Sequence, residues 1–232
     1  MGGLVHRKRR PARSPPLHIV VTAGPTREYL DSIRFLSNPS SGKMGYAIAA
    51  AAAAAARGHR VTLVSGPVDL AAPPGVRRVS VETAEQMLAA AKAAFASADV
   101  AIFAAAVCDY RPKHRATRKP AKKRGGLALA LVPTVDVAAA LGRRKAGRIT
   151  IGFALEDRAG RRRAEAKLRS KRFDAILLNA PTNIGSDRAS LDCLVAGDRW
   201  RRWTPAAKTN VAGRIIRLAE QLFAARPRAT SR

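Results

Sequence analysis

The sequence predicts an α/β fold of three layers, in which a mainly parallel sheet is covered by helices on both faces. Three observations support this prediction. Short apolar runs alternate along the chain with helical segments, which is typical of parallel sheets. The runs are apolar throughout instead of at every second position, as in strands buried on both faces. Apolar residues make up 47% of the 232, which is enough for a full core.

The first half of the chain contains three expected strands and two expected helices. A long polar loop over residues 37–45 leads into an alanine-rich helix, which we expect to end at Arg57-Gly58 because glycine readily caps a helix C-terminus. Thr83-Ala-Glu-Gln86 has the capping-box pattern that opens a helix, here extending to about Ser97. The strands are expected over residues 18–24, 61–65 and 99–107.

The second half begins with a stretch unlike the rest, residues 109–126. It holds eight Lys and Arg residues, two prolines and no apolar periodicity, so we expect a mobile cationic flap. A strongly basic helix is expected around 161–171, and a final helix with Thr204-Pro205 at its start, since proline suits the first helical position. The remaining strands are expected at 127–131, 148–154 and 174–179, followed by a hairpin of 191–195 with 199–204.

The two termini of the chain and its cysteines indicate in which compartment the protein acts. We expect residues 1–16 to be a disordered basic leader, residues 17–225 a single domain, and residues 226–232 a basic tail. The leader lacks the apolar segment of a secretory signal, and the alanine run is shorter than the roughly 20 residues that span a bilayer. Cys108 and Cys193 cannot build a disulfide framework. A cytoplasmic protein without membrane contact is therefore expected.

The charge is strongly positive, with 43 Lys and Arg against 16 Asp and Glu, a formal net of +27. Such an excess attracts nucleic acid, membrane surfaces or phosphorylated substrates. The basic residues are spread along the chain without interleaved aromatic residues for base stacking. We expect only non-specific contact with nucleic acid, and a basic nucleic-acid-binding protein remains the alternative.

Three places at the expected carboxyl edge of the sheet carry polar residues, and such edges bind ligands in open α/β folds. The first comprises Gly24, Ser40, Ser41, Gly42 and Lys43. Backbone N–H groups at a glycine-rich helix start attract phosphate, and a lysine adds charge. An ordinary solvated loop explains the pattern equally well. Neither a Walker A loop nor a G-x-G-x-x-G fingerprint is present, which disfavours a Rossmann-type oxidoreductase.

The other two places are a carboxylate and a set of lysines. Asp109 follows a core strand, where it would reach a metal or a nucleotide, or would serve only as a turn residue. The lysines lie in the flap and on the basic helix, where residues four apart share one face. They would neutralise a triphosphate or form a solvated stripe. They are Lys119, Lys122, Lys123, Lys167 and Lys171.

A series of motifs in fixed order resembles the phosphopantothenoylcysteine synthetase family, usually the C-terminal half of a bifunctional flavoprotein in bacteria. The motifs are Thr22–Glu28, Ser37–Gly45, Val64–Pro67, Ala105–Arg111, Ile151–Glu156 and the Lys167/Lys171 pair before Asp174–Asn179. The resemblance covers roughly residues 17–225. It implies a Rossmann-like fold, a homodimer and a two-step ligation. The carboxylate of 4′-phosphopantothenate attacks the α-phosphate of CTP, releasing pyrophosphate, and the amine of L-cysteine then displaces CMP from the acyl-cytidylate.

The resemblance also implies roles for individual residues. Asn38 would hold the acyl-cytidylate for its reaction with cysteine, and Lys119 would close over this intermediate. Asp109 would bind both the nucleotide and Mg²⁺, the expected metal, while CTP is the expected co-substrate. The further nucleotide-binding positions are Thr134, Val135, Asp136, Val137, Phe153, Lys167 and Lys171.

The chain departs from the family pattern in places. The flap has Lys119-Pro-Ala-Lys-Lys123 in place of Lys-Ile-Lys-Lys, so a degenerate, inactive synthetase homologue is a further alternative. Thr134-Val-Asp136 replaces Asn-Pro-Asp in the base-recognition loop, which leaves ATP open as the nucleotide. Cys108 stands where alanine is usual. No decarboxylase half precedes Leu17, so we expect no flavin and a separate phosphopantothenoylcysteine decarboxylase.

Overall fold

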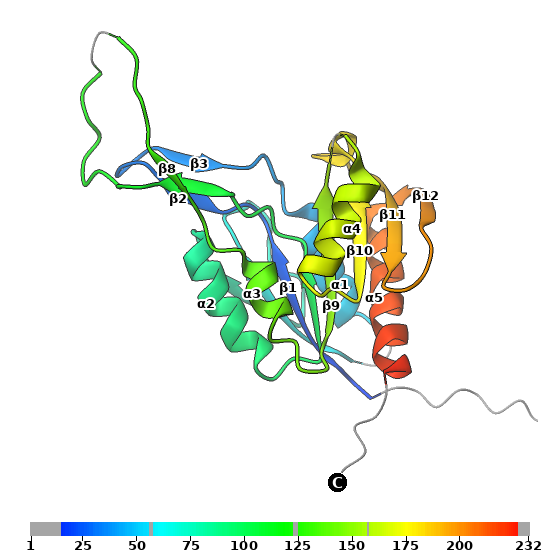
Figure 1. Ribbon diagram of the computed structural model, residues 1–232. Helices are drawn as coiled ribbons and strands as arrows, with labels where there is room; N and C mark the ends of the chain where they lie inside the picture. Colours follow the sequence, from blue (N-terminus) through cyan, green and yellow to red (C-terminus); the bar gives the residue numbers. More distant parts are fainter. Residues whose placement is uncertain (1–14, 56–57, 123–124, 157, 227–232) are drawn as a thin grey trace, which may run out of the picture.

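The computed structural model describes residues 15–55, 58–122, 125–156 and 158–226. An eight-stranded sheet forms its centre, in the order β12-β11-β10-β9-β6-β1-β4-β5 (Figure 1). The six neighbouring strands from β10 to β5 in this order are parallel to one another, and β11 pairs antiparallel with both β10 and β12. The strands are β1 (His18–Ala23), β4 (Arg60–Ser65), β5 (Val76–Ser80), β6 (Val100–Phe103), β9 (Ile149–Leu155), β10 (Ala175–Asn179), β11 (Arg188–Val195) and β12 (Arg201–Ala207).

Helices cover both faces of the sheet, which confirms the predicted three-layer, Rossmann-like fold. Helices α1 and α5 pack on one face, and α2, α3 and α4 pack on the other. The helices are α1 (Lys43–Ala53), α2 (Ala84–Phe95), α3 (Val137–Gly142), α4 (Gly160–Ser170) and α5 (Lys208–Ala225), with a 3₁₀ turn at Pro181–Asn183. Small side chains allow close layers: a Cβ on Gly45 of α1 would lie 2.4 Å from the Cβ of Ala23 in β1.

The strand order places a crevice where ligands are expected. From β1 the chain crosses by α1 to β4 on one side, whereas α2 returns it to β6 on the other side of β1. The carboxyl ends of β1 and β6 therefore lie side by side at the point where the strand order reverses. In open α/β sheets, this point is the usual binding crevice.

An arm, which we define as residues 27–37, 110–122 and 125–133, projects from this edge (Figure 1). It contains two small antiparallel pairs and the loop that carries the predicted cationic flap. The N–H of Ala116 in that loop donates to the carbonyl of Leu30, which ties the two parts of the arm together. The mobility of the flap stays a prediction. The pairs are β2 (Arg27–Tyr29) with β3 (Phe35–Ser37), and β7 (Tyr110–Pro112) with β8 (Leu131–Pro133).

The expected helix boundaries were correct for α2 and wrong at two other places. Thr83 and Gln86 form the predicted capping box. Helix α1 already ends at Ala53, and Gly58, with a φ of +64°, forms a left-handed turn after it, while Arg57 lies outside the described residues. Alanine carries no stop signal, so the sequence could not locate this end. Gly58 donates to the carbonyl of Ala55, so it shapes the turn toward β4 instead of capping the helix.

The predicted start of the last helix and one predicted strand were also wrong. Pro205 lies in β12 and not at a helix start, and α5 begins only at Lys208. Because β12 is the edge strand, the missing N–H of proline removes no ladder hydrogen bond from the sheet interior. The strand expected at 127–131 begins only at Leu131, because it pairs with β7 across the arm, and residues 127–130 have no regular structure.

Other elements differ in extent or were missed. The strand expected over 99–107 is β6, which ends at Phe103, after which the chain leaves the sheet to form the wall of the crevice. The hairpin β2–β3, strand β5 and helix α3 were not predicted. Residues 1–14 and 227–232 lie outside the described part of the chain, so the leader and the tail stay predictions.

Across the described residues, no helix combines the length and the apolar character that a bilayer span requires.

Candidate active site

A cleft of about 640 Å³ lies at the carboxyl edge of the sheet, over the crevice between β1 and β6. Loops after β3, β6, β8 and β10 form its walls, together with the last residues of β9, the first residues of α1, α3 and α5, Lys167 of α4 and the residue after that helix, Lys171. The cleft brings together most of the predicted site residues. These are Asn38, Ser40, Ser41, Gly42, Lys43, Asp109, Thr134, Val135, Asp136, Val137, Phe153, Lys167 and Lys171.

Two predicted site residues do not line the cleft. Gly24, with a φ of +72°, lies behind its wall, and its carbonyl accepts a 2.9 Å hydrogen bond from the N–H of Ala106. Its role is therefore to shape the turn after β1. Lys119 is exposed on the arm, away from the cleft lining. A role for Lys119 over an intermediate would require movement of the flap or a neighbouring copy of the chain.

The N-terminus of α1 opens into the cleft without a side-chain cap. Gly42 is the N-cap residue in a left-handed conformation, and a Cβ there would come within 2.9 Å of Val68. Only glycine fits this position without strain. Because no side chain of the described structure caps this helix, its first N–H groups are available to an anion.

Asn38 is held at the exit of β6. Its Nδ2 atom donates to the carbonyls of Ala106, at 3.3 Å, and Val107, at 3.0 Å. These two bonds use the donor group and leave the side-chain oxygen for a ligand. The backbone that exits β6 thus fixes the orientation of this side chain before any ligand arrives.

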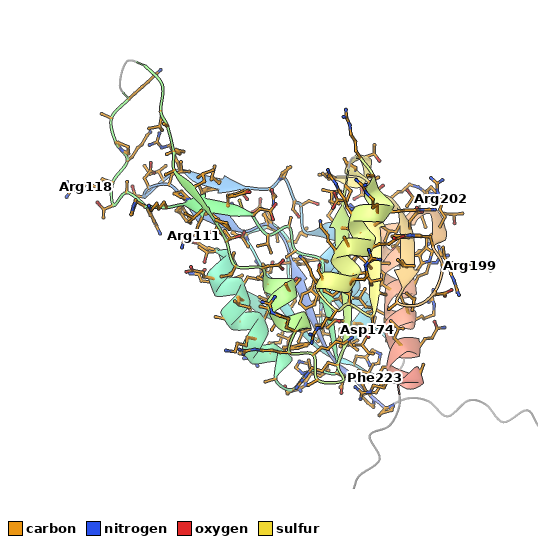
Figure 2. The ribbon with its side chains drawn as sticks, in the orientation of Figure 1. Arg111, Arg118, Asp174, Arg199, Arg202 and Phe223 are labelled. Carbon is orange, nitrogen blue, oxygen red and sulfur yellow. The ribbon has the colours of Figure 1, made fainter. Side chains whose placement is uncertain are left out.

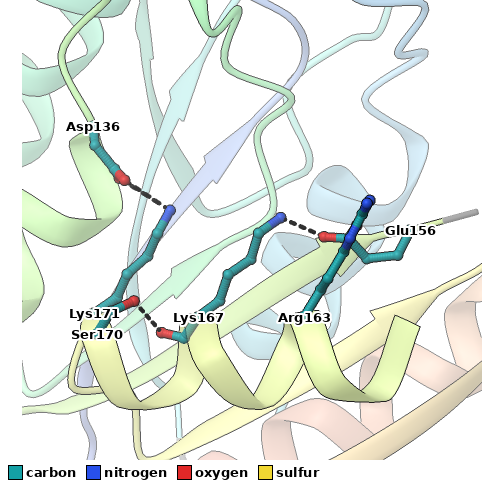
Figure 3. A network of polar contacts seen from close by, with 6 residues as sticks. All are labelled: Asp136, Glu156, Arg163, Lys167, Ser170 and Lys171. Atoms are coloured by element: carbon teal, nitrogen blue, oxygen red, sulfur yellow. Dashed lines mark hydrogen bonds and ion pairs between the residues drawn. The ribbon is translucent and has the colours of Figure 1, made fainter. Parts of the chain in front are cut away.

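Lys167 of α4 and Lys171, the C-cap residue of that helix, reach into the cleft, and each is paired with a carboxylate (Figure 3). Lys167 Nζ lies 2.7 Å from Glu156 Oε1, and Lys171 Nζ lies 2.9 Å from Asp136 Oδ2. Asp136 also caps α3 by accepting from the N–H of Ala139. In the free protein, therefore, neighbouring carboxylates neutralise these cations, and Glu156 also pairs with Arg163 at 3.2 Å.

Asp109 contributes a carboxylate without a partner among the described residues. The backbone carbonyl of Asp109 accepts from the N–H of Thr134, which fixes its position beside the loop before α3, while its side chain stays exposed. Within the described residues, no three His, Cys, Asp or Glu side chains group as a metal site. One carboxylate fits Mg²⁺, which is commonly held by one or two carboxylates together with phosphate oxygens and water.

Cys108 precedes Asp109 and is buried, with its thiol directed to the carbonyl of Tyr110. No histidine is hydrogen-bonded to this thiol in the part of the chain that the structure describes. This agrees with the interpretation of Cys108 as a small residue at a strand end.

The sequence interpretation missed one end of the cleft. Asn179, Asn183, Gly185 and Lys208 line it, from the connection between β10 and β11 and from the start of α5. Burial lowers the pKa of Lys208, the positive charge of Lys43 lowers it further, and Asp187 opposes these effects. Only an isolated lysine in the sequence signals this end, and that pattern is too common to identify a site.

The basic residues do not gather on one face. Arg118 lies on the arm, whereas Arg199 and Arg202 lie at the opposite edge of the molecule (Figure 2). Many arginines instead stack on aromatic rings of the protein itself, such as Arg161 on Trp200 at 5.5 Å and Arg214 on Trp203 at 4.9 Å. Rings covered in this way are not available to stack bases, which argues against a nucleic-acid-binding surface.

Comparisons with known proteins identify relatives of the chain. Residues 16–222 match the family described as the DNA/pantothenate metabolism flavoprotein C-terminal domain. The coenzyme A biosynthesis bifunctional protein CoaBC of Bacillus subtilis (strain 168) is 43% identical over 163 residues, which is 70% of this chain and 40% of that protein. This chain thus spans less than half the length of that relative.

Solved structures agree with this match. The crystal structure of the C-terminal domain of a CoaBC protein superposes with a TM-score of 0.78 at 36% identity, covering 91% of this chain and 98% of that one. A Cab2 mutant in complex with phosphopantothenate-cysteine has a TM-score of 0.71 at 16% identity, covering 90% of this chain and 88% of that one. At this identity the second match supports the fold alone.

Proposed function

This chain belongs to the DNA/pantothenate metabolism flavoprotein C-terminal domain family, and we propose on this basis that it is a ligase joining 4′-phosphopantothenate to L-cysteine. The nucleotide in this proposal is CTP, and the intermediate is an acyl-cytidylate. The relatives named for coenzyme A biosynthesis support the reaction class. The product would be the substrate of a decarboxylase, for which a separate protein stays a prediction.

One observation carries the proposal: the cleft combines separate anion-binding features at the switch point of the sheet. The uncapped N-terminus of α1 with Lys43 lies in one part, and Lys167 and Lys171 lie in another. Two phosphorylated reactants repel each other in water, so a catalyst for their reaction must neutralise both. No enzyme nucleophile is required, in agreement with a thiol at Cys108 that is buried and hydrogen-bonded.

The reaction proceeds in two displacements. The carboxylate of 4′-phosphopantothenate attacks the α-phosphorus of CTP, a P–O bond forms, and pyrophosphate leaves with the electron pair of the broken P–O bond. The amine of L-cysteine then attacks the acyl carbon, the amide C–N bond forms, CMP leaves, and the amine loses a proton. There is no redox step in this sequence, and a flavin is not needed.

The residues of the cleft contribute mainly by positioning and charge. Lys167 and Lys171 would exchange their carboxylate partners for phosphate oxygens of the nucleotide. The side-chain oxygen of Asn38 would accept a hydrogen bond from the intermediate or from the incoming amine. Asp109 would hold Mg²⁺, which supplies charge neutralisation on the phosphates when bound.

The base would lie against residues 134–137, at the start of α3, beside Phe153. We propose CTP over ATP because the family resemblance favours it, although Thr134 and Val135 replace the usual residues of this loop. The preference is measured directly by comparing CTP and ATP as substrates at equal concentration.

The arm supports the proposed homodimer. Large apolar side chains are exposed along it, and such a concentration on one projection is typical of an interface. A second copy of the chain is the partner that we propose, and sedimentation of the whole protein would give twice the mass of the chain. The exposed side chains are Ile33, Phe35, Tyr110, Leu127, Leu129 and Leu131.

Pyrophosphate release tests the proposal. With Mg²⁺, CTP and 4′-phosphopantothenate, we expect release that continues only when L-cysteine is present, and amide product in equal amount. Asn38→Asp and Lys119→Gln should each abolish turnover if these residues act on the intermediate, and the exposed Lys92→Met on α2 is the control. Absence of product with both CTP and ATP, from folded protein, would indicate the inactive homologue instead.

A further inference from the structure

Two lysines lie at one end of the cleft, each at the first position of a long helix. Lys43 begins α1 and Lys208 begins α5, and these two helices pack against each other on the same face of the sheet. Both lysines line the cleft. We call this end, formed by Lys43, Lys208 and residues 183–187, the lysine corner.

Lys208 is nine-tenths buried, with an exposed fraction of 9%. Its Nζ atom donates a 3.1 Å hydrogen bond to the carbonyl of Asn183, and it forms no ion pair with any described residue. An ammonium group has three N–H donors, so this single hydrogen bond leaves donors available to a ligand. Burying an ammonium without an anionic partner is costly, and such a residue is stabilised when an anion arrives.

Lys43 adds a second positive charge near the buried ammonium group of Lys208. Its Nζ lies 2.7 Å from Asp187 Oδ1 and 3.3 Å from the carbonyl of Gly185. The Asp187 side chain is 86% exposed, so water screens it strongly. The corner therefore holds two cations and one exposed carboxylate, and its net charge is positive. The lowered pKa of Lys208, due first to burial and then to Lys43, is in accord with this imbalance.

The helix ends add to the positive potential. Helix α1 has 11 residues and α5 has 18, and no side chain of the described structure caps either N-terminus. The N–H of Lys208 itself is used by the carbonyl of Asp187, so the first N–H groups of α1 are the main free donors. A phosphate has several oxygens and up to two negative charges, which match two ammonium groups and these N–H groups.

We propose that the lysine corner is a phosphate subsite, in which Lys43 and Lys208 bind a phosphate group of one of the two reactants. The identity of those reactants rests on the proposed function, whereas phosphate binding does not. The polyphosphate of the nucleotide and the phosphomonoester of 4′-phosphopantothenate share this chemistry, and the binding experiment separates them. Lys208 is the additional residue that this subsite brings to the cleft.

Calorimetric titration of the whole chain tests the subsite. The probes are inorganic pyrophosphate, CTP, 4′-phosphopantothenate, and pantothenate as the analogue without phosphate. Lys208→Met should weaken at least one phosphate ligand by roughly tenfold or more, because a hydrogen bond to a charged group is lost. Pantothenate should bind the variant as it binds the wild type. Lys92→Met removes the same charge from an exposed position of α2 on the opposite face and should change nothing.

The pattern of losses identifies the ligand. Weaker pyrophosphate and CTP with unchanged 4′-phosphopantothenate would assign the corner to the nucleotide, and the converse would assign it to the phosphomonoester. If Lys208→Met does not give the circular dichroism of the wild type, Lys43→Met decides in its place. Unchanged affinity of a folded variant for all three phosphates would overturn the proposal. Phosphate binding at the corner without any ligation would refute the proposed function and leave the subsite standing.

Discussion

The two ends of the cleft hold their positive charge in different ways. At the α4 end, Lys167 and Lys171 are each paired with a carboxylate, Glu156 and Asp136. At the lysine corner, Lys208 is more deeply buried and has no such pair among the described residues. A lysine can therefore await a phosphate in two states, either paired with a carboxylate that the phosphate replaces or without an anionic partner.

The paired end loses little when a ligand arrives. The Lys167 side chain is 40% exposed, so water screens its charge, and the Glu156 side chain, which is only 7% exposed, keeps Arg163 as a partner at 3.2 Å when Lys167 turns to a phosphate. A phosphate that carries more charge can therefore replace the carboxylate. Lys208 has no carboxylate to exchange among the described residues, so its interaction with phosphate is not offset by the loss of an ion pair.

The largest effect is expected for Lys167→Ala at the paired end. If this lysine contacts the phosphates as the reaction proceeds, pyrophosphate release should fall by roughly a hundredfold, the scale of losing one charge-stabilising group. CTP should also bind more weakly, which calorimetric titration measures. Lys167→Arg keeps the charge and should retain part of the rate. Unchanged CTP affinity in Lys167→Ala would refute the phosphate role.

A smaller effect of opposite sign is expected for Glu156→Gln. The carboxylate competes with phosphate for Lys167, so its neutral analogue should tighten pyrophosphate binding by roughly two- to fivefold. Asp192→Asn is the matched control, because Asp192 pairs with Arg161 of the same helix and does not line the cleft. Weaker binding in Glu156→Gln would instead mean that the carboxylate holds Lys167 in position.

The smallest effect concerns stability at high pH. Burial and Lys43 lower the pKa of Lys208 below 10.5, against the effect of Asp187. Between the lowered value and 10.5 the unfolded chain binds more protons, so this group makes the folded protein more stable as pH rises. The difference in melting temperature between Lys208→Met and wild type should therefore shift toward the wild type on approaching pH 10.5. A difference that is constant with pH would contradict a buried, destabilised ammonium.

Much of the site could be predicted because its residues follow strands. Asp109 follows and Phe153 lies within a buried apolar run, and parallel strands bring their carboxyl ends to one edge. Asn38 instead follows the short strand β3 outside the central sheet, and the Ser37–Gly45 motif identified it. The Lys167/Lys171 pair was visible as two lysines four residues apart on a helix. The fold could also be predicted, because strand and helix periodicities are local properties of the sequence.

The remainder depends on contacts between distant residues. The cleft contains Lys208 because the hairpin of β11 and β12 continues through Pro205, which delays the start of α5. Sequence patterns placed that start at Thr204-Pro205 and so put Lys208 inside a helix. Likewise, the pairing of Lys171 with Asp136 joins residues 35 apart along the chain, and no local pattern predicts it.

A single turnover without cysteine tests the central claim most directly. With enzyme in excess over CTP, and with Mg²⁺ and 4′-phosphopantothenate, acid quenching at successive times would follow both pyrophosphate and the nucleotide product. We predict about one pyrophosphate per active site, with CMP joined to the pantothenate carboxylate and released when L-cysteine is added. Pyrophosphate that forms only after cysteine is added, or a nucleotide that never joins the carboxylate, would contradict an acyl-cytidylate made in this cleft.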